Sequence, residues 1–116
     1  FVHVVNALNL MQEKLKDVDI SRNITKIDSC AFQRCESLTT ITIPEGVVEI
    51  GEGAFSDCFK LSSITLPNSL KTIGAVAFCD CDKIASVIIP DGVIEIGGSA
   101  FSGCDKLAVE FSQKYR

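Results

Sequence analysis

Residues 50–67 read IGEGAFSDCFKLSSITLP, and residues 73–90 follow the same pattern as IGAVAFCDCDKIASVIIP. The two stretches begin 23 residues apart and share their Ile-Gly, Ala-Phe, Cys and final Pro. Four columns recur at this spacing: Ala31, Ala54, Ala77 and Ala100; Phe32, Phe55, Phe78 and Phe101; Cys35, Cys58, Cys81 and Cys104; and Ile27, Ile50, Ile73 and Ile96. Such a fixed period is typical of a solenoid in which each repeat forms one coil.

The length and composition fit one domain that spans residues 1–116. Hydrophobic residues make up 47% of the chain and the mean hydropathy is +0.30, so a continuous core can form between stacked coils. The predicted repeats are 1–23 (a degenerate cap), 24–46, 47–69, 70–92 and 93–115.

One repeat has two recognisable parts. Residues 38–44 alternate like a short strand, with Ile41 and Ile43 facing inward, and a turn at Pro44 ends the strand. Ala54–Cys58 spaces its apolar residues like a helical or 3₁₀ turn. The predicted fold class is therefore α/β, as a solenoid of short parallel strands with short helical or 3₁₀ segments.

The two ends depart from the pattern. In residues 1–23, Val4, Leu8, Met11 and Leu15 recur at helical spacing, which predicts an amphipathic helix in a capping repeat. Val4 also falls in the Ile27 column. At the other end the strand alternation is displaced by one residue at Leu107–Phe111, which implies a deletion or a bulge. We expect this end either to continue into further repeats or to self-associate.

Six cysteines raise the possibility of disulfides, a metal or free thiols. Side chains in a parallel ladder point the same way, which disfavours disulfides within the Cys column. The outer members of that column would be roughly 14 Å apart by strand spacing, too far for one zinc ion. Cys30 and Cys79 lie outside the column. We expect buried free thiols, with no metal and no cofactor.

Charge and motif content argue against several classes of function. The formal net charge is −4 and the pI about 4.9, which disfavour nucleic acid as a partner. No apolar run approaches the roughly 20 residues that span a bilayer, so we expect no membrane insertion in this segment. His3 is the only histidine, and the nucleophile, zincin and phosphate-loop motifs lack their first elements, so we predict no enzymatic activity.

The outward positions of the predicted strands are the candidate binding site. We call them the outward strip, and they are Asp17, Asp19, Thr40, Thr42, Ser63, Thr65, Ser86 and Ile88. This hydroxyl-rich face with an acidic end can contact a protein, weakly per coil because it lacks Trp, Tyr and Arg anchors. Ile88 replaces Thr in its column and Phe59 replaces Glu or Asp, so each is either a contact or an ordinary exposed apolar residue.

The pattern Ile-Gly-x-x-Ala-Phe-x-x-Cys-x-x-Leu-x-x-Ile-x-Leu-Pro over residues 50–67 resembles the BspA-like leucine-rich repeats, also called the treponemal type. The resemblance implies a right-handed superhelix on the surface of bacteria or protozoan parasites. It also implies binding to host matrix proteins or other cells, hence a cell-surface or secreted protein. Two alternatives stay open: a structural spacer, and a cytoplasmic scaffold, which reduced cysteines would favour.

Overall fold

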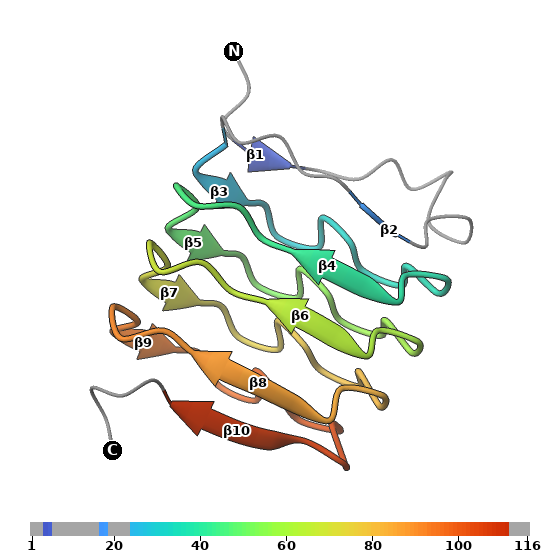
Figure 1. The fold of residues 1–116 in the computed structure, drawn as a ribbon. Coiled ribbons are helices and arrows are strands. Elements are labelled where there is room, and N and C mark those ends of the chain that lie inside the picture. Colours follow the sequence, from blue (N-terminus) through green and yellow to red (C-terminus); the bar gives the residue numbers. More distant parts are fainter. Residues whose placement is uncertain (1–3, 6–16, 19–23, 112–116) are drawn as a thin grey trace.

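The structure is a computed structural model that describes residues 4–5, 17–18 and 24–111. Ten short strands wind through it in parallel coils (Figure 1). Their bounds are β1 Val4–Val5, β2 Asp17–Val18, β3 Lys26–Ile27, β4 Thr40–Thr42, β5 Glu49–Ile50, β6 Ser63–Thr65, β7 Thr72–Ile73, β8 Ser86–Ile89, β9 Glu95–Ile96 and β10 Ala108–Phe111. The predicted solenoid of parallel strands is confirmed.

The odd-numbered strands form one continuous sheet in the order β1-β3-β5-β7-β9, which we call the odd-strand sheet. Lys26 pairs with Glu49 across two coils, and their charged groups lie 3.6 Å apart. β1 pairs Val5 with Ile27, so the prediction that Val4 occupies the Ile27 column is wrong by one residue. Val4 itself lies in a strand and not in the expected helix, whose other positions lie outside the described residues.

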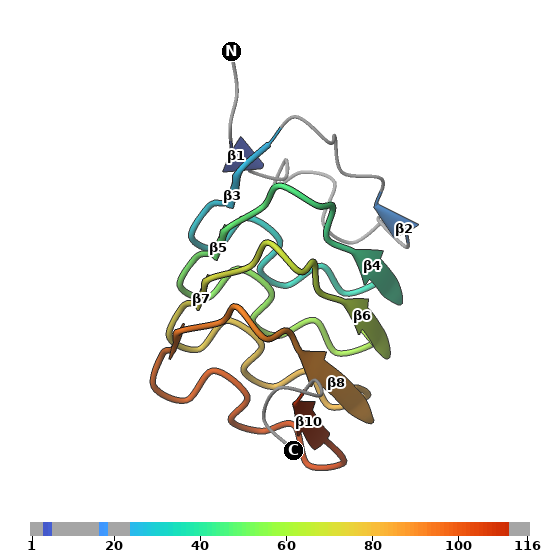
Figure 2. The same ribbon diagram turned by 60° about the vertical axis from the view of Figure 1, so that its left-hand side comes forward.

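The even-numbered strands lie on a second side of the solenoid, which we call the strand face (Figure 2). β2, β4 and β6 pair in that order, and β10 pairs with β8. β4 and β6 pair residues 23 apart, such as Thr40 and Ser63, whereas β8 and β10 pair residues 22 apart, such as Val87 and Val109. The predicted slip of one residue is therefore confirmed, and of the two expected causes, a deletion or a bulge, the pairing of residues 22 apart indicates a deletion.

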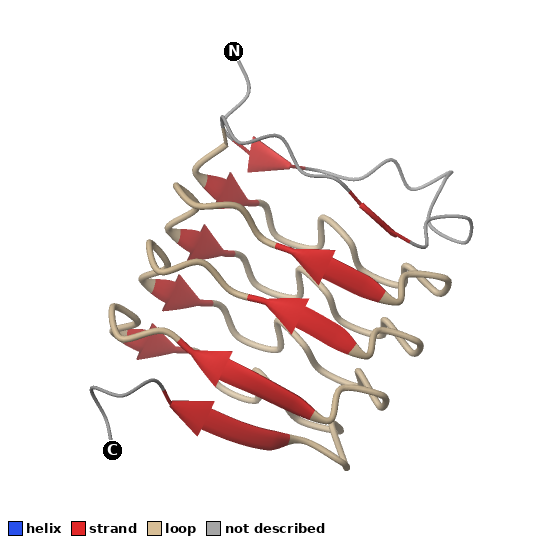
Figure 3. Ribbon diagram, in the orientation of Figure 1, coloured by secondary structure: helices blue, strands red, loops and turns tan. Residues whose placement is uncertain are grey.

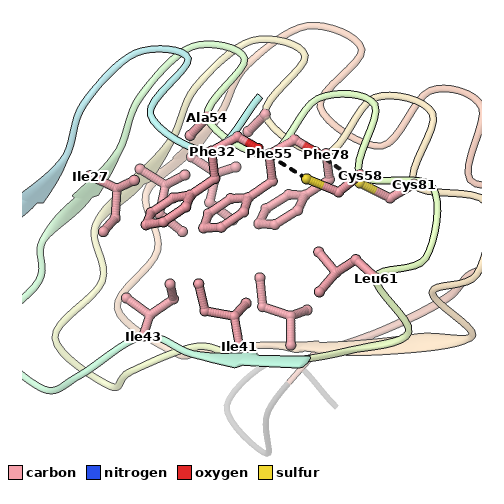
Figure 4. Close-up of a cluster of buried hydrophobic side chains, with 14 of the residues drawn as sticks. Ile27, Phe32, Ile41, Ile43, Ala54, Phe55, Cys58, Leu61, Phe78 and Cys81 are labelled. Atoms are coloured by element: carbon pink, nitrogen blue, oxygen red, sulfur yellow. Dashed lines mark hydrogen bonds between the residues drawn. The ribbon is translucent and has the colours of Figure 1, made fainter. Parts of the chain in front are cut away.

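The phenylalanine column forms a file through the core (Figure 4). Ring centroids of successive residues from Phe32 to Phe101 are 5.1, 5.3 and 5.3 Å apart, with nearly parallel planes. Phe55 and Phe78 have no exposed surface. Ile41 and Ile43 enter the same core from the strand face, so each coil buries its apolar side against its neighbours.

The third side, which we call the turn side, runs through residues 28–37 and their equivalents in each coil and contains no helix within the described residues (Figure 3). The N–H groups of Ala31 and Gln33 donate to carbonyls three residues earlier, at 3.1 and 3.2 Å. Those of Cys30, Phe32 and Arg34 donate to the next coil at 2.9, 2.7 and 2.8 Å. A continuing helix donates its successive N–H groups within its own segment, whereas here alternate N–H groups go to the next coil, so the predicted helical segments are replaced by linked turns.

Left-handed backbone conformations flank each of these turns. Two columns have positive φ: Cys30, Gly53, Val76 and Ser99, and Arg34, Asp57, Asp80 and Gly103. Because L-residues with side chains rarely adopt this region, the repeat holds non-glycine residues there under strain, most of all the β-branched Val76 at φ 50°. These columns turn the chain back before a helix can extend.

A glycine column brings neighbouring coils into close contact. A Cβ on Gly51 would lie 2.7 Å from the backbone nitrogen of Ser29, and one on Gly74 would lie 2.6 Å from that of Glu52. Neither glycine has a positive φ. Glycine is therefore required here for space between coils and not for a special backbone conformation.

Candidate functional site: the strand face

Six residues of the outward strip are exposed as predicted, namely Thr40, Thr42, Ser63, Thr65, Ser86 and Ile88. Four of them lie in two aligned rows, because Thr40 pairs with Ser63 and Thr42 with Thr65 in the strand register, and Ser86 and Ile88 lie on the neighbouring strand β8. The backbone of Asp17 pairs with Thr40, but its side chain is not described, and Asp19 lies outside the described residues.

Buried neighbours fix the direction of the strip. Ile41, Ile64 and Val87 alternate with its members and have 3, 7 and 2% of their surface exposed. A slip of one residue would bury the hydroxyls and expose these apolar side chains. Ile88 differs from the Thr and Ser residues of the strip because it is large and apolar, and 59% of it is exposed. Phe59 is also exposed, at 44%, but it lies beyond the strands on the turn side.

The hydrogen-bond ladder of the strand face is interrupted between β6 and β8, both of which are fully described. In the flanking rungs, the Ser62 N–H donates to the Thr39 carbonyl at 2.9 Å and the Ala108 N–H to the Ala85 carbonyl at 2.8 Å. The equivalent bond from the Ala85 N–H to the Ser62 carbonyl is not formed. The two strands are neighbours in Figure 1, but they are not paired.

The interruption extends to the other end of the same two strands. The Ile43 N–H donates to the Thr65 carbonyl at 2.9 Å, whereas the equivalent N–H of Leu66, within the described residues, does not reach the Ile88 carbonyl. Polar backbone groups that are paired elsewhere on the face are therefore available here for another partner.

A groove of about 310 Å³ lies at this interruption. It is lined by Ser62, Ser63, Ile64, Thr65, Leu66, Asn68, Ser86, Val87, Ile88 and Pro90. Its lining includes four residues of the outward strip together with an amide side chain, and it contains no charged side chain. The sequence does not identify Ser62, Asn68 and Pro90 as contacts, because the repeat columns are as regular here as elsewhere.

The cysteines of the column are buried, hydrogen-bonded and free of disulfides. Cys58 and Cys81 donate their S–H groups to the carbonyls of the phenylalanines one coil earlier, each at 3.1 Å (Figure 4). Cys104 does the same at 3.0 Å. All six cysteines of the chain are free, and the four of the column are buried, as predicted. Cys30 and Cys79 are exposed and partly exposed.

The thiols of this column resist ionisation. Its hydrogen bond with Cys58, followed by burial, raises the pKa of the Cys35 thiol far above its ordinary range. The interaction with Cys35 lowers the pKa of Cys58, but the hydrogen bond with Cys81 and burial outweigh it and raise that pKa to about 12. Burial also raises the pKa of Cys104. Because the thiolate is the nucleophile and metal ligand, these three side chains serve as packing groups.

Other chemistry finds little support in the described part of the chain. There, no group of three or more His, Cys, Asp or Glu side chains is arranged to hold a metal ion. Nor do residues 4–5, 17–18 and 24–111 contain a helix with the length and hydrophobicity to cross a membrane. His3 lies outside the described residues.

Known proteins share this repeat. The family described as "BspA type Leucine rich repeat region" matches residues 6–115 in six copies. No curated protein shows significant similarity to the chain.

Solved structures of bacterial proteins are similar to this chain. A leucine rich cell surface protein from Faecalibacterium prausnitzii is 41% identical, with a TM-score of 0.79 over 85% of this chain and 26% of its own. A leucine-rich repeat protein from Bacteroides ovatus is 39% identical, with a TM-score of 0.80 and the same coverage. The pneumococcal vaccine antigen PcpA is 31% identical, with a TM-score of 0.77 over 82% of this chain and 24% of its own. This chain thus spans about a quarter of each of these proteins.

Proposed function

The chain belongs to the BspA-type leucine-rich repeat family, and from this premise we propose that it is a protein-binding module of a cell-surface or secreted protein. Its strand face contacts a host matrix protein or another cell-surface protein. The exposed, aligned rows of the outward strip are the observation that carries this proposal.

The physical character of the strip supports a binding role. Its rows are held in place from inside by buried residues such as Ile41 and Val87, so the surface is already ordered before a partner arrives. A preordered surface loses little conformational entropy on binding. Ile88 adds an exposed apolar group in the middle of the short polar side chains.

Two of the similar bacterial proteins favour the same interpretation. One is a leucine rich cell surface protein from Faecalibacterium prausnitzii, and the other is the pneumococcal vaccine antigen PcpA. For this chain, a location at the cell surface or in secreted form is part of the proposal.

We expect modest affinity from a single module. The strip offers short Thr and Ser side chains and none of the Trp, Tyr or Arg anchors that dominate strong interfaces. Repetition of the same face along an array raises the effective concentration of contacts and so compensates for weak individual coils.

Charge substitutions on the strip test the proposal. We expect the double variant Thr42→Arg/Thr65→Arg to weaken binding to immobilised fibronectin, laminin or collagen by about tenfold or more, because each Arg projects from the contact rows. The matched control is Thr25→Arg/Val48→Arg, which adds the same charge at exposed positions in the column that naturally holds Lys71. Binding is measured by biolayer interferometry.

The outcomes separate binding from a spacer role. Loss of binding in the strip variant alone supports the proposal. Equal binding by both variants, or none by the parent chain to any of the three probes, contradicts it and favours a structural spacer.

The free thiols keep a cytoplasmic scaffold as a second candidate. All six cysteines are free, and exported proteins usually oxidise theirs. Thiol titration of the protein from its native source, with and without reductant, weighs this candidate: reduced Cys30 and Cys79 in freshly isolated protein favour the cytoplasm.

Self-association through the last coil also remains a prediction. Ile94 and Ile96 are 81 and 40% exposed there, which gives this coil an apolar surface. Sedimentation velocity of the wild type and of Ile94→Arg/Ile96→Arg tests it, since a dimer held by this surface dissociates in the variant.

A further inference from the structure

We propose that the groove between β6 and β8 binds a neutral saccharide. This inference rests on the proposed function in one respect, because it names a glycan carried by the partner as the group that the strand face recognises. It goes further because it assigns the binding of that glycan to the one place where β6 and β8 are not hydrogen-bonded to each other.

The size and position of the groove suit a sugar unit. Its volume of about 310 Å³ lies at the lower end of the range typical of small-molecule sites, roughly 300–1,000 Å³. It opens in the middle of the described strand face, with the exposed residues Thr65 and Ser86 at its rim. A sugar at the end of a glycan can therefore enter without any strand moving apart.

The hydrogen-bonding groups of the groove both donate and accept. The unpaired Leu66 N–H is a donor, and the unpaired carbonyls of Ser62 and Ile88 are acceptors. The hydroxyls of Thr65 and Ser86 can do either. Sugar hydroxyls have the same dual character, so a saccharide can satisfy backbone groups that the interrupted ladder leaves without partners.

The lining also excludes charged ligands by its composition. None of the ten lining residues is charged, so a phosphate, sulfate or ammonium group would lose its hydration without gaining an ion pair. Ile88, which is 59% exposed, provides apolar surface beside the polar groups, and this surface can cover the C–H face of a sugar ring. The combination favours a neutral, hydroxyl-bearing ligand.

Nuclear magnetic resonance can detect this binding directly. We expect glucose, galactose, mannose or N-acetylglucosamine, added up to about 50 mM to cover a weak site with a Kd of about 1 mM, to shift the Leu66 amide signal saturably. The Ile43 amide is the internal control, because it occupies the equivalent position one coil away and is hydrogen-bonded to Thr65. Its signal should not move.

A matched pair of variants locates the site. Thr65→Val removes a hydroxyl that lines the groove, and Thr42→Val removes the equivalent hydroxyl one coil away, outside it. We expect Thr65→Val to weaken sugar binding about two- to tenfold, the effect of one hydrogen bond, and Thr42→Val to leave it unchanged.

Two results overturn the inference. One is the absence of a saturable shift with any of the four sugars, which leaves a side chain of a protein partner as the occupant of the groove. The other is equal weakening by both variants. Neither result affects the matrix-protein assay of Thr42→Arg/Thr65→Arg, and a failure of that assay with intact sugar binding removes only the protein-binding proposal.

Discussion

The turn side and the strand face of this solenoid join their coils in different ways. On the turn side, the N–H groups of residues such as Phe32, Phe55 and Phe78 all reach the next coil, at 2.7 Å in each case. On the strand face the ladder stops between β6 and β8. The comparison indicates that one side holds the coils together while the other can expose polar backbone groups, because the continuous side maintains the stacking.

The largest expected loss of stability comes from removing a ring from the phenylalanine column that packs beneath the turn side. Phe55→Ala should lower the free energy of unfolding by about 3–5 kcal/mol, because it leaves a cavity between two stacked rings. The control Phe59→Ala, at a position 44% exposed, should change it by about 0.5 kcal/mol or less. Urea denaturation followed by circular dichroism measures both. Similar losses in the two variants would contradict the stacked core.

Alkaline pH should weaken the same side through its thiols. Cys35 and Cys58 have raised pKa values in the folded protein, that of Cys58 at about 12, whereas an unfolded cysteine ionises near about 8.5. Both thiols are protonated in both states below about pH 8.5, so stability is unaffected there. Above it the unfolded chain loses protons first, and stability should fall by about 1.4 kcal/mol per pH unit for each thiol.

Urea denaturation between pH 8 and pH 10 measures this loss. Cys58→Ala removes one of the thiols whose pKa is raised and is the matched variant, so its stability should fall less steeply with pH. An equally steep fall in both proteins would assign the pH dependence to other groups.

Glycine substitution tests how tightly the coils approach. Gly74→Ala should destabilise by about 1–3 kcal/mol, because the new Cβ would lie 2.6 Å from a backbone nitrogen of the preceding coil. Gly98→Ala is the control, since nothing lies within 4 Å of a Cβ at that position. Thermal unfolding of the two variants gives the difference, and equal melting temperatures would disprove the close approach.

Relief of backbone strain should strengthen the turn side. Val76→Gly should stabilise by about 1 kcal/mol, because glycine accepts φ 50° and Gly53 holds the same position one coil earlier. Ala75→Gly, next to it without a positive φ, should destabilise by about 0.5–1 kcal/mol. Denaturant titration measures both, and a loss of stability in Val76→Gly would show that valine packing outweighs strain.

Hydrogen exchange tests at a single amide whether the ladder of the strand face is interrupted between β6 and β8. The Leu66 amide lacks a ladder partner and should exchange faster than the Ile43 amide, which is bonded at 2.9 Å in the equivalent position. Nuclear magnetic resonance after transfer into heavy water compares them. Equal protection would mean that β6 and β8 pair in solution.

The architecture could be predicted from residue types, because buried positions recur at a fixed spacing along the chain. A period of 23 aligns Phe32 with Phe55, and the two-residue alternation of strands decides that Ile41 faces inward and Thr42 outward. The strip is a direct consequence, so six of its eight residues could be located in advance.

Backbone details could not be predicted in the same way. Ala54–Cys58 has apolar spacing that suits a helical turn and linked β-turns equally, and the choice depends on left-handed residues such as Val76, whose type carries no such signal. The groove exists because the Leu66 N–H does not donate to the Ile88 carbonyl. Residue types do not indicate which hydrogen bonds between neighbouring strands form.

The one-way hydrogen bonds of the turn side give the solenoid an orientation. In the columns of Cys30, Phe32 and Arg34, the N–H groups of three successive coils all donate toward the C-terminal neighbour, as from Phe55 to the Ala77 carbonyl. The two ends of a stack are therefore chemically unlike, one offering acceptors and the other donors on this side. In these three columns, a coil added upside down would set donor against donor, which disfavours stacking in that sense.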